Sequence, residues 1–193
     1  MMGWAAGNGA AAGASQGEAG WLCSRGSEPM SKTLLVMRHA KSSWKDASLS
    51  DHDRPLNKRG RTAAPRMGEL IRDQGILPDY IATSSALRAR ATAEAVADAC
   101  GYSGTIRELC ELYLAPPAAY VQAVRGIDTD LGRVLVVGHN PGITQLVCEL
   151  ARADEVMPTG ALALIELPIR RWADLDFGVS GQLMRLWRPR ELD

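Results

Sequence analysis

Residues 33–41 read TLLVMRHAK, and the fold is decided by this stretch. After Thr33 the run LLVM is apolar at every position, which is typical of a strand buried on both faces of a parallel sheet. Arg38 and His39 follow this strand directly. In open α/β sheets ligands bind outside the carboxyl ends of the strands, so we expect this pair to belong to a functional site.

The rest of the chain alternates apolar runs of strand length with helical patterns. Further strands are predicted at 80–83, 134–137, 161–167 and 182–187, and helices at 57–74, 86–100, 116–125 and from 140 to about 151. Pro65 is expected to kink or break the first helix, and Ser85 and Asn140 to act as N-caps of the second and fourth. This alternation predicts a three-layer α/β/α sandwich with a mostly parallel central sheet.

Composition limits the possible partners. The length of 193 residues favours one domain, and contents of 46% hydrophobic and 23% charged residues are typical of a folded chain. Lys plus Arg and Asp plus Glu both total 22, so the net charge offers no attraction for nucleic acid or for an anionic membrane. Apolar runs fall short of the roughly 18–20 residues that a membrane-spanning helix needs. Any site for an anion must therefore be local.

The first thirty residues differ from the remainder of the chain. They are rich in Gly and Ala and lack a periodic apolar pattern, so we expect a disordered extension at 1–30 and a single domain at 31–193. The extension matches neither a secretory signal nor a transit peptide, which favours a cytoplasmic location. The four cysteines form no C-x-x-C pair and histidines number only three, so we expect reduced thiols and no metal site.

Unusual residues follow three of the predicted strands. Arg38 and His39 come after the first, Arg88 lies shortly after the second, and His139 follows the third, at 134–137. Taken singly, such an arginine is usually solvated and such a histidine is usually structural. Their coincidence at one rim favours a site for an anion.

The residue types indicate phosphate chemistry. Guanidinium groups match phosphate oxygens in bidentate geometry, and a helix N-terminus adds backbone N–H donors. A neutral imidazole is a competent nucleophile toward phosphorus, and nearby arginines disfavour its protonated form. These features predict phosphoryl transfer through a phosphohistidine intermediate, with neither a metal nor another cofactor.

Three separated motifs carry a resemblance to a known family. LLVMRHAKSSW at 34–44, TSSALRARATAEA at 83–95 and VVGHNPGI at 136–143 resemble the histidine phosphatase superfamily, which has the phosphoglycerate-mutase-like fold. DHDRPLNKRG at 51–60 is more similar to the SixA-type phosphohistidine phosphatases than to the mutases. The resemblance covers about residues 32–188.

The resemblance implies a role for each residue of the rim. His39 would be the nucleophile that accepts the phosphoryl group. Arg38 and Arg88 would hold the phosphate oxygens, and His139 would donate a hydrogen bond to the phosphoryl group and stabilise its charge during transfer.

The resemblance leaves two assignments open: the general acid and the role of Lys41. The family position of the general acid falls in the segment 108–113, where we expect Glu111, with Glu108 as its competitor. Lys41 occupies the loop after the nucleophile and either adds positive charge to the substrate-binding rim or points into solvent.

The resemblance leaves three functions open. The first is dephosphorylation of phosphohistidine on a signalling phosphotransfer protein, which suits an open site because only the short connections 108–117 and 168–181 are available to cover it. The second is hydrolysis of a small phosphate ester or another phosphorylated metabolite. The third is a non-catalytic module that docks phosphorylated ligands.

Overall fold

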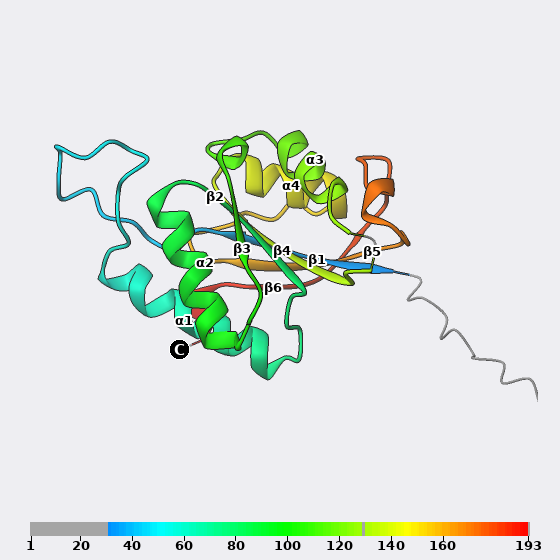
Figure 1. The fold of residues 1–193 in the computed structure, drawn as a ribbon, viewed down its shortest axis with the longest axis horizontal. Helices are drawn as coiled ribbons and strands as arrows, with labels where there is room; N and C mark the ends of the chain where they lie inside the picture. The colour runs from blue at the N-terminus through cyan, green and yellow to red at the C-terminus, as the bar shows by residue number, and fades with distance from the viewer. Residues whose placement is uncertain (1–30, 129, 193) are drawn as a thin grey trace, which may run out of the picture.

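The computed structural model describes residues 31–128 and 130–192. The predicted extension at 1–30 lies outside the described residues, so its disorder stays a prediction. The described part contains four helices, six strands and three short 3-10 helices, arranged around one sheet (Figure 1). None of these helices is long and apolar enough to cross a membrane.

The sheet is mixed rather than uniformly parallel. Its strands are β1 (Lys32–Arg38), β2 (Tyr80–Ser84), β3 (Ile106–Leu109), β4 (Arg133–Gly138), β5 (Leu162–Leu167) and β6 (Gln182–Trp187). They lie in the order β3-β2-β4-β1-β5-β6, and the first four are parallel to one another. β5 runs antiparallel to β1, and β6 runs antiparallel to β5. Sequence reasoning missed β3, because this short edge strand exposes Arg107 and Glu108 and has no apolar run.

Two helices cover each face of the sheet and complete the predicted three-layer sandwich (Figure 1). The helices α1 (Lys58–Asp73) and α2 (Leu87–Cys100) pack on one face, where Met67 and Ile71 join the buried strand residues. The helices α3 (Pro117–Arg125) and α4 (Gly142–Ala151) pack on the other. The three 3-10 helices are η1 (Cys110–Leu112), η2 (Trp172–Asp174) and η3 (Pro189–Glu191).

The expectation that Pro65 breaks the first helix is wrong. Pro65 lies inside α1, which continues to Asp73. A proline costs the helix one backbone hydrogen bond, but most helical stability in proteins comes from tertiary packing. Packing of α1 against α2 supplies this stability here. The two helices are so close that a Cβ at position 68 would stand only 2.5 Å from the carbonyl oxygen of Val96.

The two predicted N-caps are also wrong. The N-cap position of α2 is Ala86 and that of α4 is Pro141, and neither helix has a side-chain cap. Ser85 instead contacts His52 across a loop, with 3.0 Å between Oγ and Nε2. Asn140, which precedes a cis peptide bond, accepts a hydrogen bond from the hydroxyl of Thr144 at 3.1 Å. Tertiary partners thus compete with capping for both side chains.

We predict that Gly68→Ala will destabilise the fold, because its methyl group would force α1 and α2 apart. The expected loss is about 1–3 kcal/mol of unfolding free energy, measured by urea denaturation. Glu69→Ala is the control, since position 69 is exposed on the same helix and should change stability by less than about 0.5 kcal/mol. Equal stability of the two variants would contradict the close helix contact.

Candidate active site

The register of the two central strands brings the two histidines together. β1 and β4 run parallel, and Arg38 is paired with Gly138, so His39 and His139 occupy equivalent positions just beyond the strand ends. Their ring centroids lie 5.0 Å apart. Gly138 is required here, because a Cβ at this position would collide with the Tyr120 hydroxyl. That hydroxyl accepts a hydrogen bond from the backbone N–H of His139 at 3.1 Å.

His39 is held with one ring nitrogen available for reaction. Its Nδ1 lies 2.8 Å from the carbonyl of Ala40, and a carbonyl can only accept, so the ring proton is assigned to Nδ1. The lone pair then belongs to Nε2, which accepts a hydrogen bond from Nε of Arg88 at 3.3 Å. Thr92 fixes the turn that carries the ring by accepting the backbone N–H of Ala40 at 3.0 Å.

Both histidines are neutral at neutral pH. Burial is the largest cause that lowers the pKa of His39, and together with the charges of Arg88 and Arg38 it brings the pKa to about 4 against the opposing effect of the Ala40 carbonyl. Burial also lowers the pKa of His139 to about 3, assisted by His39 and Arg88. A neutral His39 keeps its lone pair, which is the form that a nucleophile requires.

His139 is oriented by a serine at the end of the neighbouring strand β2. Its Nε2 lies 2.8 Å from Oγ of Ser84, and that hydroxyl accepts the backbone N–H of Ala86 at 3.3 Å. We assign the hydroxyl proton to the bond with Nε2, which is the tautomer that leaves the ring proton on Nδ1. This Nδ1 is buried and has no hydrogen-bond partner among the described residues, so it can donate to a bound oxyanion.

Arg38 offers a second uncommitted donor. One of its terminal nitrogens donates to the carbonyl of Met157 at 3.0 Å, which fixes the direction of the guanidinium group. Its Nε is buried without a hydrogen-bond partner among the described residues. Burial also lowers the pKa of Arg38 below its ordinary value. A buried, unpaired guanidinium donor is costly unless a ligand satisfies it, which favours an anion here.

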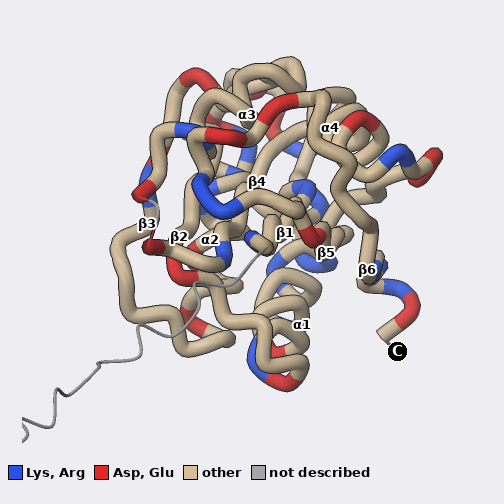
Figure 2. The backbone as a smooth tube through the Cα atoms, turned by 90° about the vertical axis from the view of Figure 1, so that its right-hand side faces the viewer, with Lys and Arg blue, Asp and Glu red and all other residues tan. Residues whose placement is uncertain are grey.

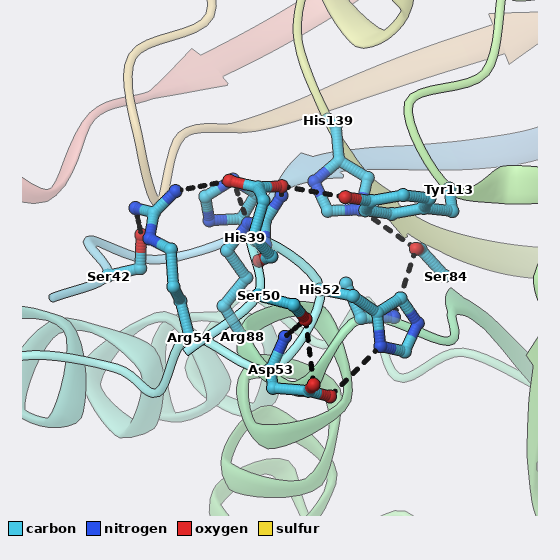
Figure 3. A network of polar contacts seen from close by, with 12 residues as sticks. His39, Ser42, Ser50, His52, Asp53, Arg54, Ser84, Arg88, Tyr113 and His139 are labelled. Atoms are coloured by element: carbon cyan, nitrogen blue, oxygen red, sulfur yellow. Dashed lines mark hydrogen bonds and ion pairs between the residues drawn. The ribbon is translucent and has the colours of Figure 1, made fainter. Parts of the chain in front are cut away.

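Asp51 organises the cations of the site and was not anticipated from the sequence. Its carboxylate accepts from Arg88 Nη2 at 2.9 Å, from Arg54 Nη1 at 2.5 Å and from the Tyr113 hydroxyl at 2.8 Å. Figure 3 labels the three donor side chains, Arg54, Arg88 and Tyr113. The backbone carbonyl of Asp51 accepts a further bond from Arg88. Burial raises the pKa of this carboxyl, but the bonds from Tyr113 and Arg54 and the charge of Arg88 outweigh it and lower the pKa to about 2.

Arg54 is the third guanidinium group of the site. It is buried, donates to Oγ of Ser42 at 2.5 Å, and stacks under the exposed ring of Trp44 with 3.1 Å between its central carbon and the ring centroid. The only available sequence signal for Arg54 was its spacing of three from Asp51 within DHDRPLNKRG. That spacing does not reveal that the loop between β1 and α1 folds back over α2.

These groups surround a cavity of about 300 Å³. Its lining comprises Arg38, His39, Lys41, Ser42, Trp44, Asp51, Arg54, Arg88, Leu114, His139, Asn140 and Thr159. The cavity thus brings together the predicted nucleophile, both predicted phosphate ligands, the predicted second histidine and Lys41. Among the described residues, no three His, Cys, Asp or Glu side chains are grouped as a metal ion would need.

The predicted general acid lies elsewhere. Glu111 is exposed on η1 and does not line the cavity. Glu108 is exposed on β3, where it pairs with Arg90 at 3.5 Å. The acidic role of either residue stays a prediction. The carboxyl group that does line the cavity, Asp51, is ionised and committed to two arginines, so it holds no proton at neutral pH.

Comparison with known proteins identifies the class. Residues 34–113 match the model of the histidine phosphatase superfamily (branch 1). An uncharacterized protein of Mycobacterium tuberculosis is 32% identical over 156 residues, which cover 75% of this chain and 95% of the relative. The chain belongs to the histidine phosphatase superfamily.

Solved structures agree at the level of fold. A proposed phosphohistidine phosphatase, SixA, from Nakamurella multipartitia superposes with a TM-score of 0.69 and 29% identity, covering 82% of this chain and 96% of that one. The structure of another proposed phosphohistidine phosphatase SixA, from Agrobacterium tumefaciens, gives a TM-score of 0.70 and 26% identity. The match covers 82% of this chain and 98% of that one. The SixA-type resemblance and the phosphoglycerate-mutase-like fold are confirmed.

We predict that the His39 ring titrates far below an ordinary histidine. Because burial and two arginines lower its pKa to about 4, the ring should stay neutral from pH 7 down to about pH 5 and carry its proton on Nδ1. Nitrogen-15 NMR of the phosphate-free protein measures both the pKa of the ring and the nitrogen that carries its proton. The partly exposed His52 is the internal reference ring. A His39 midpoint near 6.5, or a proton on Nε2, would contradict the assignment.

We predict opposite effects of Asp51→Asn on binding and turnover. The variant removes the charge that balances Arg88 and Arg54, so inorganic phosphate should inhibit more strongly, by about tenfold. Turnover should fall, because Arg88 loses an anchor beside His39. Asp53→Asn is the control, since Asp53 lies in the same loop but contacts Ser50 and His52 outside the cavity. Weaker phosphate inhibition in Asp51→Asn would contradict the hypothesis that the Asp51 charge balances Arg88 and Arg54.

Proposed function

We propose that this protein is a metal-independent phosphatase that works through a phosphohistidine at His39 and dephosphorylates phosphohistidine on a signalling phosphotransfer protein. Membership of the histidine phosphatase superfamily supports a phosphatase. The observation that carries the proposal is the held, neutral His39, whose Nε2 lone pair faces the cavity beside Arg88.

The first half of the reaction is transfer to His39. The Nε2 lone pair attacks phosphorus, an Nε2–P bond forms, and the bond from phosphorus to the substrate nitrogen breaks. The substrate ring carries a proton on its other nitrogen, so it takes the electron pair of the broken bond and leaves as a neutral imidazole. Arg38, Arg88 and the Nδ1–H of His139 stabilise the charge on the three non-bridging oxygens. The Ala40 carbonyl stabilises the positive ring that His39 becomes, because it accepts the Nδ1–H.

The second half restores the enzyme. Water attacks phosphorus, the Nε2–P bond breaks, and inorganic phosphate leaves with the water oxygen while a water proton is released. His39 then returns to its neutral form, which its lowered pKa favours. The arginines remain in place during both halves, because Asp51 anchors Arg88 and Met157 anchors Arg38.

The placement of the acids favours phosphohistidine over phosphate esters. An alkoxide leaving group needs a proton donor, whereas an imidazole departs with little assistance. Neither Glu111 nor Glu108 lines the cavity, and Asp51 is ionised. Hydrolysis of a small ester is the second reading, and it would require Glu111 to reach the cavity from η1.

The mouth of the cavity supports a protein substrate. Trp44 and Leu114 both line it and are 72% and 53% exposed, so they present apolar surface to a partner rather than enclosing a small molecule. The structures named as SixA proteins point to the same substrate class. A cytoplasmic location and the absence of nucleic-acid or membrane partners belong to this proposal.

The test is a rapid quench with a phosphohistidine peptide, followed by mass spectrometry under alkaline conditions. We expect a phosphoryl adduct on His39 in the wild type and none in His39→Ala, which should retain phosphate binding. Arg88→Ala should lose both adduct formation and phosphate affinity. His52→Ala is the matched control, because His52 lies beside the site without lining the cavity, and it should form the adduct normally.

The outcomes separate the three readings. Adduct formation from small esters but not from the peptide would move the assignment to an ester phosphatase. Phosphate binding without an adduct from either substrate would favour the non-catalytic docking module. Unchanged turnover in His39→Ala would refute the covalent mechanism.

A further inference from the structure

A second cavity lies between α1 and η3, outside the catalytic cavity. Its volume is about 490 Å³, and its charged lining consists of Lys58, Arg59, Arg66 and Arg190. Among residues 31–128 and 130–192, no carboxylate lines it. We call this feature the basic groove. Both signs of charge are interspersed over the rest of the backbone (Figure 2), and the whole chain has zero net charge, so a groove of a single sign stands out.

Helix geometry places the wall of the groove on one side of α1. Arg59, Thr62, Ala63 and Arg66 follow the spacing of three and four that aligns side chains on one helix face. Arg190 faces them from η3, which the C-terminal part of the chain brings beside α1 (Figure 1). Arg66 ties the two walls together by donating to the backbone carbonyl of Leu192.

Three of the four cations of the groove are available for a ligand. Lys58, Arg59 and Arg190 make no ion pair within residues 31–128 and 130–192, and Lys58 and Arg59 are exposed. Glu191, adjacent to Arg190, is paired with Arg188 at 3.3 Å. Three unpaired cations that converge on one hollow attract an anionic partner, most strongly at low ionic strength.

The charges in the first turn of α1 also destabilise this helix. Lys58, Arg59 and Arg61 lie within the first four residues of the helix, and the first turn holds no acidic residue. The helix N-terminus is the positive end of the macrodipole, so cations there are unfavourable. A local conflict of this kind is expected where a function requires it, and the added positive field suits an anionic ligand.

The basic groove adjoins the catalytic cavity. Lys41 lines the catalytic cavity, and its carbonyl accepts the backbone N–H of Asn57, the residue directly before Lys58. On the other side, Thr159 lines the catalytic cavity, while its neighbour Gly160 packs so closely on Pro189 that a Cβ would stand 2.8 Å from the proline ring. Pro189 itself lines the basic groove. Neighbouring residues thus connect the walls of the catalytic cavity and of the basic groove on both sides.

We propose that the basic groove binds an acidic segment of the phosphorylated protein substrate while its phosphohistidine occupies the catalytic cavity. This inference rests on the proposed function and names its partner more closely: a phosphohistidine protein that carries Asp or Glu residues next to the modified side chain. The groove raises the encounter rate and affinity of such a partner, and it plays no part in the chemistry.

The test compares two phosphohistidine peptides that are identical except for a flanking run of Glu or of Gln. At low salt the Glu peptide should have a kcat/KM about tenfold higher, and high salt should remove the difference. Arg59→Glu/Arg190→Glu should abolish the preference and leave the Gln peptide within about twofold of wild type. Arg107→Glu/Arg152→Glu is the matched control, because it makes the same charge change at exposed positions outside both cavities.

A binding measurement separates failure of the groove from failure of the proposed function. Anisotropy of a labelled Glu peptide without phosphate should show binding to the wild type and to the control variant, but not to Arg59→Glu/Arg190→Glu. If this binding pattern is found but neither phosphopeptide is hydrolysed, the proposal of a phosphohistidine substrate is refuted and the proposal of an acidic ligand in the basic groove is supported. Equal hydrolysis of both peptides, or a preference that survives in Arg59→Glu/Arg190→Glu, would overturn the groove and leave the phosphatase intact.

Discussion

The parallel pairing of β1 with β4 is the constraint on which the site depends. Because Arg38 is opposite Gly138, the next residue of each strand is a histidine, and the two rings meet over the sheet edge. A shift of one residue would turn alternate side chains to the opposite face and separate these rings. The buried Tyr120 secures the arrangement, since its hydroxyl fits only beside a glycine and holds the backbone of His139.

Charge balance explains why three guanidinium groups tolerate one another around a neutral ring. Asp51 accepts hydrogen bonds from both Arg54 and Arg88, so part of their repulsion is offset before any phosphate arrives. Arg38 retains a buried donor without a partner. The cavity therefore keeps enough positive potential for a dianion while remaining stable, and it does so without relying on cationic histidines.

Individual residues show which parts of the site the sequence pattern could predict. Arg38, His39, Arg88 and His139 each follow a buried strand, so the rule that sites form at strand ends located them. Asp51, Arg54 and Tyr113 lie on loops, where side-chain direction follows from long-range contacts rather than from a period. The same limitation explains Glu111, which the family position places near the site but which lies exposed on η1 and does not line the cavity. Ser85 and Asn140 matched the capping rule, yet both side chains serve other contacts.

The sequence by itself determined the alternation of strands and helices, the sandwich class and the four residues at the strand ends, because buried strands leave a local apolar pattern that a single chain displays. Only the tertiary structure decided the mixed strand directions, the hydrogen bonds that Asp51 accepts from two arginines and the burial that is the main cause of the neutral state of the two histidines. These properties depend on burial and on contacts between residues far apart in the chain. The basic groove belongs to the second group, since Arg190 faces Arg59 only once the C-terminal segment returns to α1.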